Sequence, residues 1–416
     1  MRRRLLAAAA VIAALAVALP AAADFAQQRR VQTNPVDNTP QVLDGEVRAF
    51  AQIGGVTVVG GDFSTVADAS GRNRFRRTNI FAFSTATGVI LNWAPQLDAP
   101  VLTLAPGDGN SVYVGGAFQR VNGVAERALA RLSLTNGARY PGFEATANWG
   151  DVRSVINKNG YLYAAGSFSA INGIPRVGLA RLNAANGALD TAFDLKLAAP
   201  KLTRVKLEDM AITSDGGRLA VVGAVQQVAG QARAQIFMVD TKVSPARLDG
   251  WYTDAYTRPC RVGFETYLRG VDFDPTNTYA VVVATGRMSG NGLMCDSAAR
   301  FELAGAGLHK PTWVNYTGGD SLYSVSATGS AIYVGGHQRW MDNPQGHESK
   351  GPGAVDRSGI AAIDPISGKA TDWNPGRKPR GVGARALLAT PYGLLVGSDT
   401  ENLGGERHPR LGLLPL

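Results

Sequence analysis

Short apolar stretches separated by turn-forming residues recur along almost the whole chain. In residues 112–118 and 162–168, a run rich in Val, Leu, Ala and Tyr ends in glycine, one variable residue and phenylalanine. Residues 129–132 and 179–182 then both read Leu-Ala-Arg-Leu, and an Asn-Gly pair follows each of them. Apolar runs rich in β-branched and aromatic residues indicate β-strands, and Asn-Gly predicts a hairpin turn because both residues tolerate positive φ. With no sustained helical period, we expect an all-β protein.

Weaker copies extend this unit to seven repeats. The glycine that ends the second strand recurs at spacings of 50 to 63 residues, at Gly61, Gly116, Gly166, Gly223, Gly286, Gly336 and Gly397. Each unit reads as four strands, of which the innermost, such as residues 101–104 or 384–388, is apolar on both faces. The fourth holds a recurring aromatic residue: Trp93, Phe193, Trp251, Trp313 or Trp373, with Trp149 in a looser copy. One four-stranded unit per repeat predicts a seven-bladed β-propeller.

The two ends of the chain predict how the ring closes. The last unit stops one strand short, and residues 35–42 resemble the fourth-strand segment 90–97. We therefore expect an N-terminal strand to complete the last blade, which pairs an otherwise open sheet edge. Residues 35–416 would then form a single domain, preceded by an N-terminal extension over residues 24–34.

Residues 1–23 predict a signal peptide. Arg2, Arg3 and Arg4 precede an unbroken apolar run over residues 5–19, and three alanines end the segment at Ala23. The apolar run of about 15 residues is short for a helix that must cross a bilayer. A retained N-terminal anchor is the alternative. We expect cleavage after Ala23 and a protein that is secreted, either extracellular or associated with the cell envelope.

The repeat pattern also resembles a known family. An apolar strand ending in Gly-Gly-x-Phe, followed by Val-Asn-Gly, an arginine, Leu-Ala-Arg-Leu and Asn-Gly, is similar to the delta-60 repeat family of secreted bacterial β-propellers, common in actinobacteria. The likeness covers most of the chain after residue 23 and is strongest in the second and third units. It implies the fold but no single activity.

One motif resembles a catalytic one. Residues 319–322 read Gly-Asp-Ser-Leu, as in the nucleophile block of an esterase family, but residues 321–325 fall where other units have their innermost strand. A catalytic serine also needs a base in reach and an oxyanion hole. One loop holds His337, Asp342, His347 and Glu348, at a spacing that fits no metal-ligand template. We expect no catalytic residues, no metal and no cofactor.

Two further features predict structural contacts. Cys260 and Cys295 are the only cysteines of an exported chain, which favours a disulfide, and both fall in connections on the same side of the ring. An arginine also recurs shortly before the third strand. It stands at Arg77, Arg176, Arg233 and Arg357, with Arg127 displaced by one, and we expect it to bridge adjacent blades through backbone carbonyls or a carboxylate.

The charge narrows the class of partner. The net charge of +9 falls to +6 when Arg2, Arg3 and Arg4 leave with the signal peptide. This excess fits attraction to anionic envelope polymers, but it is too modest to indicate nucleic-acid binding, for which clustered Lys and Arg with interleaved aromatics would be expected. We expect an extracellular glycan or protein as partner, no nucleic acid, and no integral membrane segment after signal cleavage.

Residues that depart from the repeat are the candidate ligand-binding residues, because stacking of the repeats does not need them. The loop of the first unit contributes Arg72, Arg74, Phe75 and Arg76, and the loop of the sixth contributes His337, Arg339, Trp340 and His347. These predict a non-catalytic, lectin-like binding protein. An extracellular carbohydrate-active hydrolase or lyase, and a structural subunit of a larger secreted assembly, are the alternatives.

Overall fold

The computed structural model describes residues 25–264, 266–287 and 292–416. The predicted signal peptide therefore lies outside the described residues. Over the described ranges the regular structure consists of strands alone, and they contain no helix long and apolar enough to cross a membrane. The prediction of an all-β chain is confirmed.

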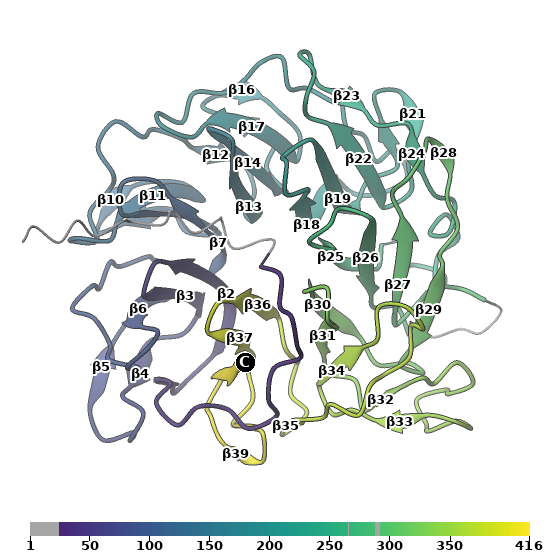
Figure 1. The fold of residues 1–416 in the computed structure, drawn as a ribbon. Helices are drawn as coiled ribbons and strands as arrows, with labels where there is room; N and C mark the ends of the chain where they lie inside the picture. The colour runs from purple at the N-terminus through teal and green to yellow at the C-terminus, as the bar shows by residue number, and fades with distance from the viewer. Residues whose placement is uncertain (1–24, 265, 288–291) are drawn as a thin grey trace, which may run out of the picture.

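Among the sheets that the described residues build, seven larger antiparallel ones surround a common centre, and we number them 1 to 7 in chain order (Figure 1). Their innermost strands are β2 (Glu46–Ile53), β7 (Val101–Gly107), β13 (Val152–Lys158), β18 (Lys206–Ile212), β25 (Leu268–Phe273), β30 (Leu322–Ala327) and β36 (Ala386–Thr390). The second strands are β3 (Val56–Asp62), β8 (Ser111–Gly116), β14 (Tyr161–Gly166), β19 (Arg218–Ala224), β26 (Tyr279–Ala284), β31 (Ile332–Gly336) and β37 (Gly393–Gly397). The third strands are β6 (Ile80–Ser84), β11 (Leu129–Ser133), β17 (Leu179–Asn183), β22 (Ile236–Asp240), β27 (Ser297–Glu302), β34 (Ile360–Ile363) and β40 (Leu411–Pro415).

The predicted fourth strands are mostly reduced. Among the described residues, only β23 (Arg247–Leu248) and β29 (Trp313–Tyr316) extend a sheet to four strands. In sheets 1, 2, 3 and 6 the fourth position makes a single bridge to the third strand. The reason lies in the recurring aromatic residue, which turns away from its own ladder. The indole N–H of Trp93 donates to the carbonyl of Ser133 in sheet 2 at 2.8 Å.

The same indole bond links other neighbouring sheets. Trp251 donates to Glu302 of sheet 5 at 3.1 Å, and Trp313 donates to Pro365, just after the third strand of sheet 6, at 3.0 Å. In sheet 6, Trp373 donates to the carbonyl of Val31 in the N-terminal segment at 2.8 Å. The fourth-strand tryptophan is therefore a link between neighbouring segments, including in sheet 5, where Trp313 also belongs to the regular strand β29.

Apolar clusters fill the gaps between adjacent sheets, and one of them joins sheet 7 to sheet 1. The approach is closest at a glycine of the second strand. A Cβ on Gly60 would lie 2.5 Å from the Cγ1 of Val101 in sheet 2, and a Cβ on Gly397 would lie 2.6 Å from the Cγ1 of Val47 in sheet 1. A side chain at these positions would push the sheets apart, which explains the glycine in sheets 1, 2, 6 and 7. The corresponding residues of sheets 3, 4 and 5 are Ala165, Val222 and Val283.

The N-terminal segment runs beside the outer strand of sheet 7. Val36 donates its backbone N–H to Leu413 of β40 at 2.9 Å, and Gln32 donates to Pro415 at 2.7 Å. The predicted strand over residues 35–42 is nevertheless irregular where it meets β40. Its last two residues form β1 (Gln41–Val42), which pairs with β4 (Thr65–Ala67) of sheet 1.

The recurring arginine bonds within its own sheet, so the prediction that it bridges adjacent units is wrong. Arg77 donates to the carbonyl of Leu91 at 3.1 Å, in the fourth segment of the same sheet. Arg176 and Arg357 make corresponding bonds to Phe193 and Thr371. A different arginine, from the third strand, reaches the next sheet: Arg131 donates to Ala184, and Arg300 donates to Pro365.

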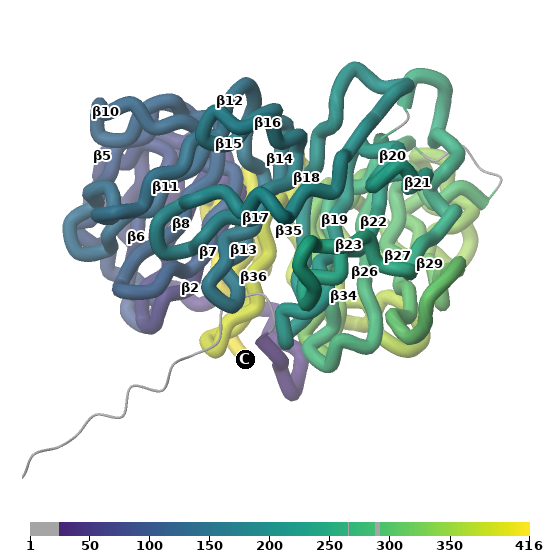
Figure 2. Tube along the Cα trace, turned by 90° about the horizontal axis from the view of Figure 1, so that it is seen from above, coloured from purple at the N-terminus to yellow at the C-terminus, as the bar shows by residue number. Residues whose placement is uncertain are grey.

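Small hairpins connect the second and third strands, and all of them lie at one end of the sheets. They pair β4 with β5 (Arg74–Arg76), β9 (Arg120–Val121) with β10 (Val124–Ala125), β15 (Ala170–Ile171) with β16 (Ile174–Pro175), β20 (Gln227–Val228) with β21 (Gln231–Ala232), β32 (Trp340–Met341) with β33 (Val355–Asp356), and β38 (Asn402–Leu403) with β39 (Glu406–Arg407). The links into the innermost strands lie beside these hairpins, as where β12 (Ala147–Asn148) pairs with β15 and β35 (Arg377–Lys378) with β38. We call these hairpins and links the loop side, along the upper edge in Figure 2.

The predicted disulfide is confirmed. Cys260, in the link into sheet 5, is bonded to Cys295, which precedes the third strand of the same sheet. Both cysteines are buried in the cluster between sheets 4 and 5. The link at this point also adds a parallel pair, β24 (Trp251–Tyr252) with β28 (Gly307–Leu308).

Replacing both cysteines by alanine should lower the free energy of unfolding by about 3–4 kcal/mol, the chain-entropy contribution of a loop with a sequence separation of 35. Denaturant unfolding of the Cys260→Ala/Cys295→Ala variant measures this loss. Thr257→Ala, an exposed position in the same link, should stay close to the wild type. Equal stability of the double variant and the wild type would contradict the expectation.

Candidate functional site

One residue near the start of each innermost strand leaves the β-ladder. In sheets 1 to 6, the pairing of the first and second strands shifts register at this point. The shift bypasses Arg48, Leu102, Arg153, Glu208, Arg269 and Tyr323. Such a bulge adds one residue to one strand and re-aims its side chain. Arg385, just before β36, holds the same place in sheet 7, and we call these seven residues the bulge ring.

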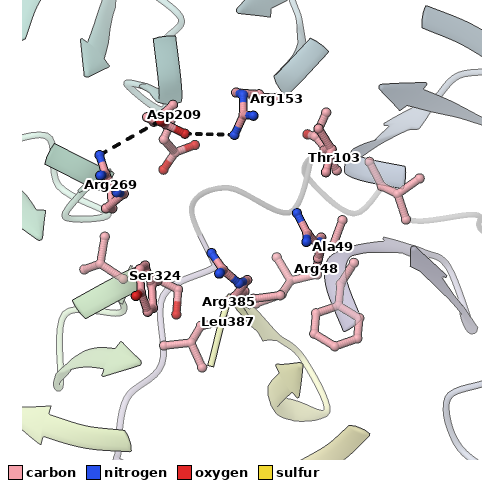
Figure 3. Close-up of a pocket in the computed structure, with 17 residues that line it drawn as sticks. Arg48, Ala49, Thr103, Arg153, Asp209, Arg269, Ser324, Arg385 and Leu387 are labelled. Atoms are coloured by element: carbon pink, nitrogen blue, oxygen red, sulfur yellow. Dashed lines mark hydrogen bonds and ion pairs between the residues drawn. The ribbon is translucent and has the colours of Figure 1, made fainter. Parts of the chain in front are cut away.

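The bulge ring lines a cavity of about 250 Å³ at the centre of the molecule. Figure 3 shows the guanidinium groups of Arg48, Arg153, Arg269 and Arg385 around one open space. A second cavity of about 220 Å³ continues along the axis, since the two share lining residues such as Asp209. Because the innermost strands start at the loop side, the ring surrounds the end of this channel that faces the loops. We call the first cavity the channel mouth.

Two arginines of the ring share one carboxylate. Glu46 pairs with Arg48 through one oxygen, and the Nε of Arg385 lies 3.0 Å from the other. The Arg385 Nε is not aligned for a hydrogen bond to that oxygen, and the buried Nε of Arg48 likewise has no acceptor among the described protein groups. The sheet 7 to sheet 1 side of the mouth therefore carries more positive charge and more N–H donors than its own groups satisfy.

Glu208 compensates the opposite side. Its carboxylate lies 3.0 Å from Arg153 and 2.9 Å from Lys206, while Arg269 is more distant at 3.9 Å. Burial tends to raise the pKa of the Glu208 carboxyl, but these three cations outweigh it and lower that pKa overall. Burial lowers the pKa of the Arg269 guanidinium. The loss of hydration destabilises its charged form more than the Glu208 carboxylate stabilises it.

Asp209 lies one step deeper in the channel. One of its oxygens accepts hydrogen bonds from the hydroxyl of Ser154 at 3.1 Å and the N–H of Met210 at 2.8 Å. The other accepts from the N–H of Val271 at 3.2 Å. Burial is the main cause that raises the pKa of Asp209 to about 6, and these hydrogen bonds oppose it. This carboxyl therefore titrates near neutral pH.

Aromatic side chains connect the ring to the loop side at sheet 6. The Arg385 guanidinium stacks over Tyr323 at 4.6 Å, and Tyr323 meets the edge of His337 with ring centroids 5.7 Å apart. Burial, and then the charge of Arg380, lower the pKa of His337, so this imidazole is biased toward its neutral form. Of the residues predicted from sequence, His337 is the one that reaches the bulge ring.

Asp320 of the esterase-like motif is an anchor for arginines. It is 1% exposed and accepts three hydrogen bonds from Arg339, through the backbone N–H and the guanidinium, and a further one from Arg380. Ser321 is buried against the hydroxyl of Thr285, and Leu322 begins β30. The prediction of an innermost strand over residues 321–325 is confirmed from Leu322 onward, whereas Ser321 lies just before β30.

The remaining predicted residues of sheet 6 lie along its loop. Asp320 fixes Arg339, whose guanidinium stacks over Trp340 at 4.2 Å. Trp340 is half-buried in β32, and His347 is exposed further along the loop. This group therefore extends outward from the channel mouth.

The predicted residues of sheet 1 form a separate group. Arg72, Arg74 and Arg76 are exposed around β5, whereas Phe75 packs against the cluster between sheets 7 and 1. Figure 1 shows β5 and β32 far apart at the rim, with sheet 7 between their sheets. The structure does not bring these residues together with those of sheet 6, because each hairpin stays beside its own sheet.

The sequence interpretation misplaced Trp149. Phe143 occupies the fourth-strand position of sheet 2, where it packs edge-on against Tyr113 as Phe193 packs against Tyr163 in sheet 3. Trp149 follows β12 on the loop side, is 73% exposed and has a φ of 53°. A left-handed conformation at a bulky residue is strained, and such strain concentrates at functional sites.

The sequence interpretation also missed the bulge ring, although a recurring residue in the sequence indicates it. Aligning the units at the first residues of their innermost strands puts arginine at one position in four of seven: Arg48, Arg153, Arg269 and Arg385. Strict alternation of strand side chains assigns this position to a sheet face. The bulge re-aims this side chain toward the axis, and the sequence of a single strand does not predict where a bulge occurs.

Comparisons with known proteins agree with this architecture. A family model described as "Domain of unknown function (DUF5122) beta-propeller" matches residues 110–143 and 158–193, within sheets 2 and 3. The crystal structure of the computationally designed Ika8 protein is similar, with a TM-score of 0.50, 9% identity, and coverage of 93% of this chain and 100% of that chain. No curated protein matches. The chain thus contains a β-propeller domain, and these likenesses carry the fold alone.

Asp209 should make stability depend on pH. Its folded pKa of about 6 exceeds the unfolded value of about 3.9, so the folded protein binds more protons between these values. Its stabilising contribution is complete below about pH 4 and is lost as the pH rises through 6. Relative to Asp209→Asn, the wild type should lose about 2–3 kcal/mol of unfolding free energy between pH 4 and pH 7.5. Urea unfolding of both proteins measures this difference, and a constant difference would contradict it.

Proposed function

We propose that the chain is an exported protein in which residues 35–416 form a single, closed, seven-bladed β-propeller, after a signal peptide (1–23) and an extension (24–34). The cluster between sheets 7 and 1, and the close approach of Gly397 to Val47, support closure. The indole bond from Trp373 to Val31 supports the N-terminal segment as the outer part of the last blade, because it repeats the bond that the other tryptophans make to the next sheet.

The protein binds an extracellular glycan through its loop side and is non-catalytic. Trp149 carries this proposal. A strained, exposed indole costs stability and buries little apolar surface, whereas it offers a flat face on which a sugar ring can stack. Polar groups able to hydrogen-bond a sugar follow within a few residues of Trp149. They are Asp151 and Arg153, which pair with each other at the channel mouth.

A protein partner is the second candidate. Val124, Ile174, Val262 and Val382 are 51%, 43%, 100% and 45% exposed on the loop side. Exposed apolar residues favour protein contacts where they form one patch. These four belong to separate hairpins and links, so the glycan is the better-supported ligand.

The catalytic alternative would rest on Asp209, because a carboxyl that titrates near neutral pH is a candidate acid or base. Its two oxygens are already engaged by three donors from Ser154, Met210 and Val271. A general acid or base must instead face the substrate within hydrogen-bond reach. Binding without turnover fits this geometry better than hydrolysis or β-elimination.

A glycan array probed with the purified secreted protein tests the proposal. We expect the wild type to bind a defined set of glycans, and Trp149→Ala to weaken that binding at least about tenfold, roughly 1.4 kcal/mol. Ile366→Ala is the matched control, because Ile366 is 85% exposed in the turn at the opposite end of sheet 6. It should bind as the wild type does.

Thermal unfolding of Trp149→Ala should match that of the wild type, which separates lost binding from lost folding. Absence of binding to any glycan, or release of a cleavage product from one, would overturn the proposed function.

A further inference from the structure

The charges around the channel mouth do not balance. Five cations meet there: Arg48, Arg153, Arg269, Arg385 and Lys206. Four carboxylates face them: Glu46, Asp151, Glu208 and Asp209. One positive charge is left over when Asp209 is ionised, and two when it is protonated. In a partly desolvated cavity, a bound anion would stabilise this excess more than it would at an exposed surface.

The excess concentrates on Arg269 and Arg385. Glu208 lies 3.9 Å from Arg269, whose guanidinium otherwise donates to the backbone carbonyls of Leu268 at 3.0 Å and Thr266 at 3.5 Å. Arg385 shares Glu46 with Arg48 and has a buried Nε–H without an acceptor. These arginines belong to sheets 5 and 7, and Tyr323 of sheet 6 lies between their positions in the ring. Arg269 has no carboxylate closer than 3.9 Å among the described residues and Arg385 shares its carboxylate with Arg48, so neither guanidinium has a close ion-pair partner of its own.

The size of the mouth limits what enters it. A cavity of about 250 Å³ is smaller than the roughly 300–1,000 Å³ of pockets that enclose a whole drug-sized ligand. It has room for one terminal group, while the rest of a longer ligand lies on the loop side. An excess of one positive charge matches one singly charged oxyanion.

We propose that the channel mouth is a subsite for a singly charged oxyanion on a sugar, bound between Arg269 and Arg385. This deepens the proposed function, on which it rests, by naming the ligand class as an acidic glycan. The carboxylate of a uronic acid and the sulfate ester of a sugar share this chemistry. Both present oxygens that a guanidinium fork can bind in pairs.

Isothermal titration with three oligosaccharides of one backbone, uronate-bearing, sulfated and neutral, tests the subsite. We expect an acidic form to bind at least about tenfold more tightly than the neutral form, and added salt to weaken that preference. Preference for the uronate form or for the sulfated form identifies the source of the charge.

The variant Arg269→Gln/Arg385→Gln should lose the preference for acidic forms and retain the binding of the neutral form. Arg247→Gln/Lys369→Gln removes the same charge from exposed positions outside the channel and away from the loop side, and should keep the preference. Circular dichroism and thermal unfolding confirm that both double variants are folded.

Equal affinity of the wild type for acidic and neutral forms would overturn the subsite and leave glycan binding intact. Retention of the acidic preference in Arg269→Gln/Arg385→Gln would also overturn it. Binding of free glucuronate without binding of any oligosaccharide would support the subsite but contradict the proposed glycan-binding function.

Discussion

Each sheet of this protein has to bury both of its faces against its neighbours, and the rest of the structure follows from that constraint. Glycine at the close approach, as at Gly60 and Gly397, lets the sheets meet without a gap. Trp93 and Trp373 then lock the outer edge of one sheet to the segment that follows it in space. Because the faces are used for packing, only the axis and the two ends of the sheets remain for binding.

The bulge converts this packing into a site. Side chains alternate along a regular strand, so every residue of an innermost strand would point into one of the two packed faces. The extra residue removes one side chain per sheet from this alternation, and the packing of its neighbours is preserved. Three of the six residues so displaced are arginines, and Arg385 holds the same place in sheet 7 without a register shift. Glu208 offsets these four arginines only in part. The strand geometry that builds the core therefore also forms the site.

The sequence predicted the repeats, the all-β fold, the innermost strand over residues 322–325 and the Cys260–Cys295 disulfide, because each of these depends on periodicity or on residue type alone. It failed where a residue's role depends on its neighbours in space. Trp149 matched the fourth-strand aromatics by composition, but it follows β12, which pairs with β15 on the loop side. Arg77 recurs as an inter-sheet bridge would, yet its acceptor lies in its own sheet. Arg269 carries no motif, since a bulge has no local sequence signature.

The central claim, that the bulges surround the channel mouth with uncompensated positive charge, is open to a direct measurement. Crystals of the protein soaked in bromide and measured at the bromine absorption edge would locate bound anions by anomalous scattering. The account predicts a bromide in the channel mouth in contact with the guanidinium groups of Arg269 and Arg385. Bromide confined to exposed arginines, with these two guanidinium groups paired to carboxylates, would contradict it.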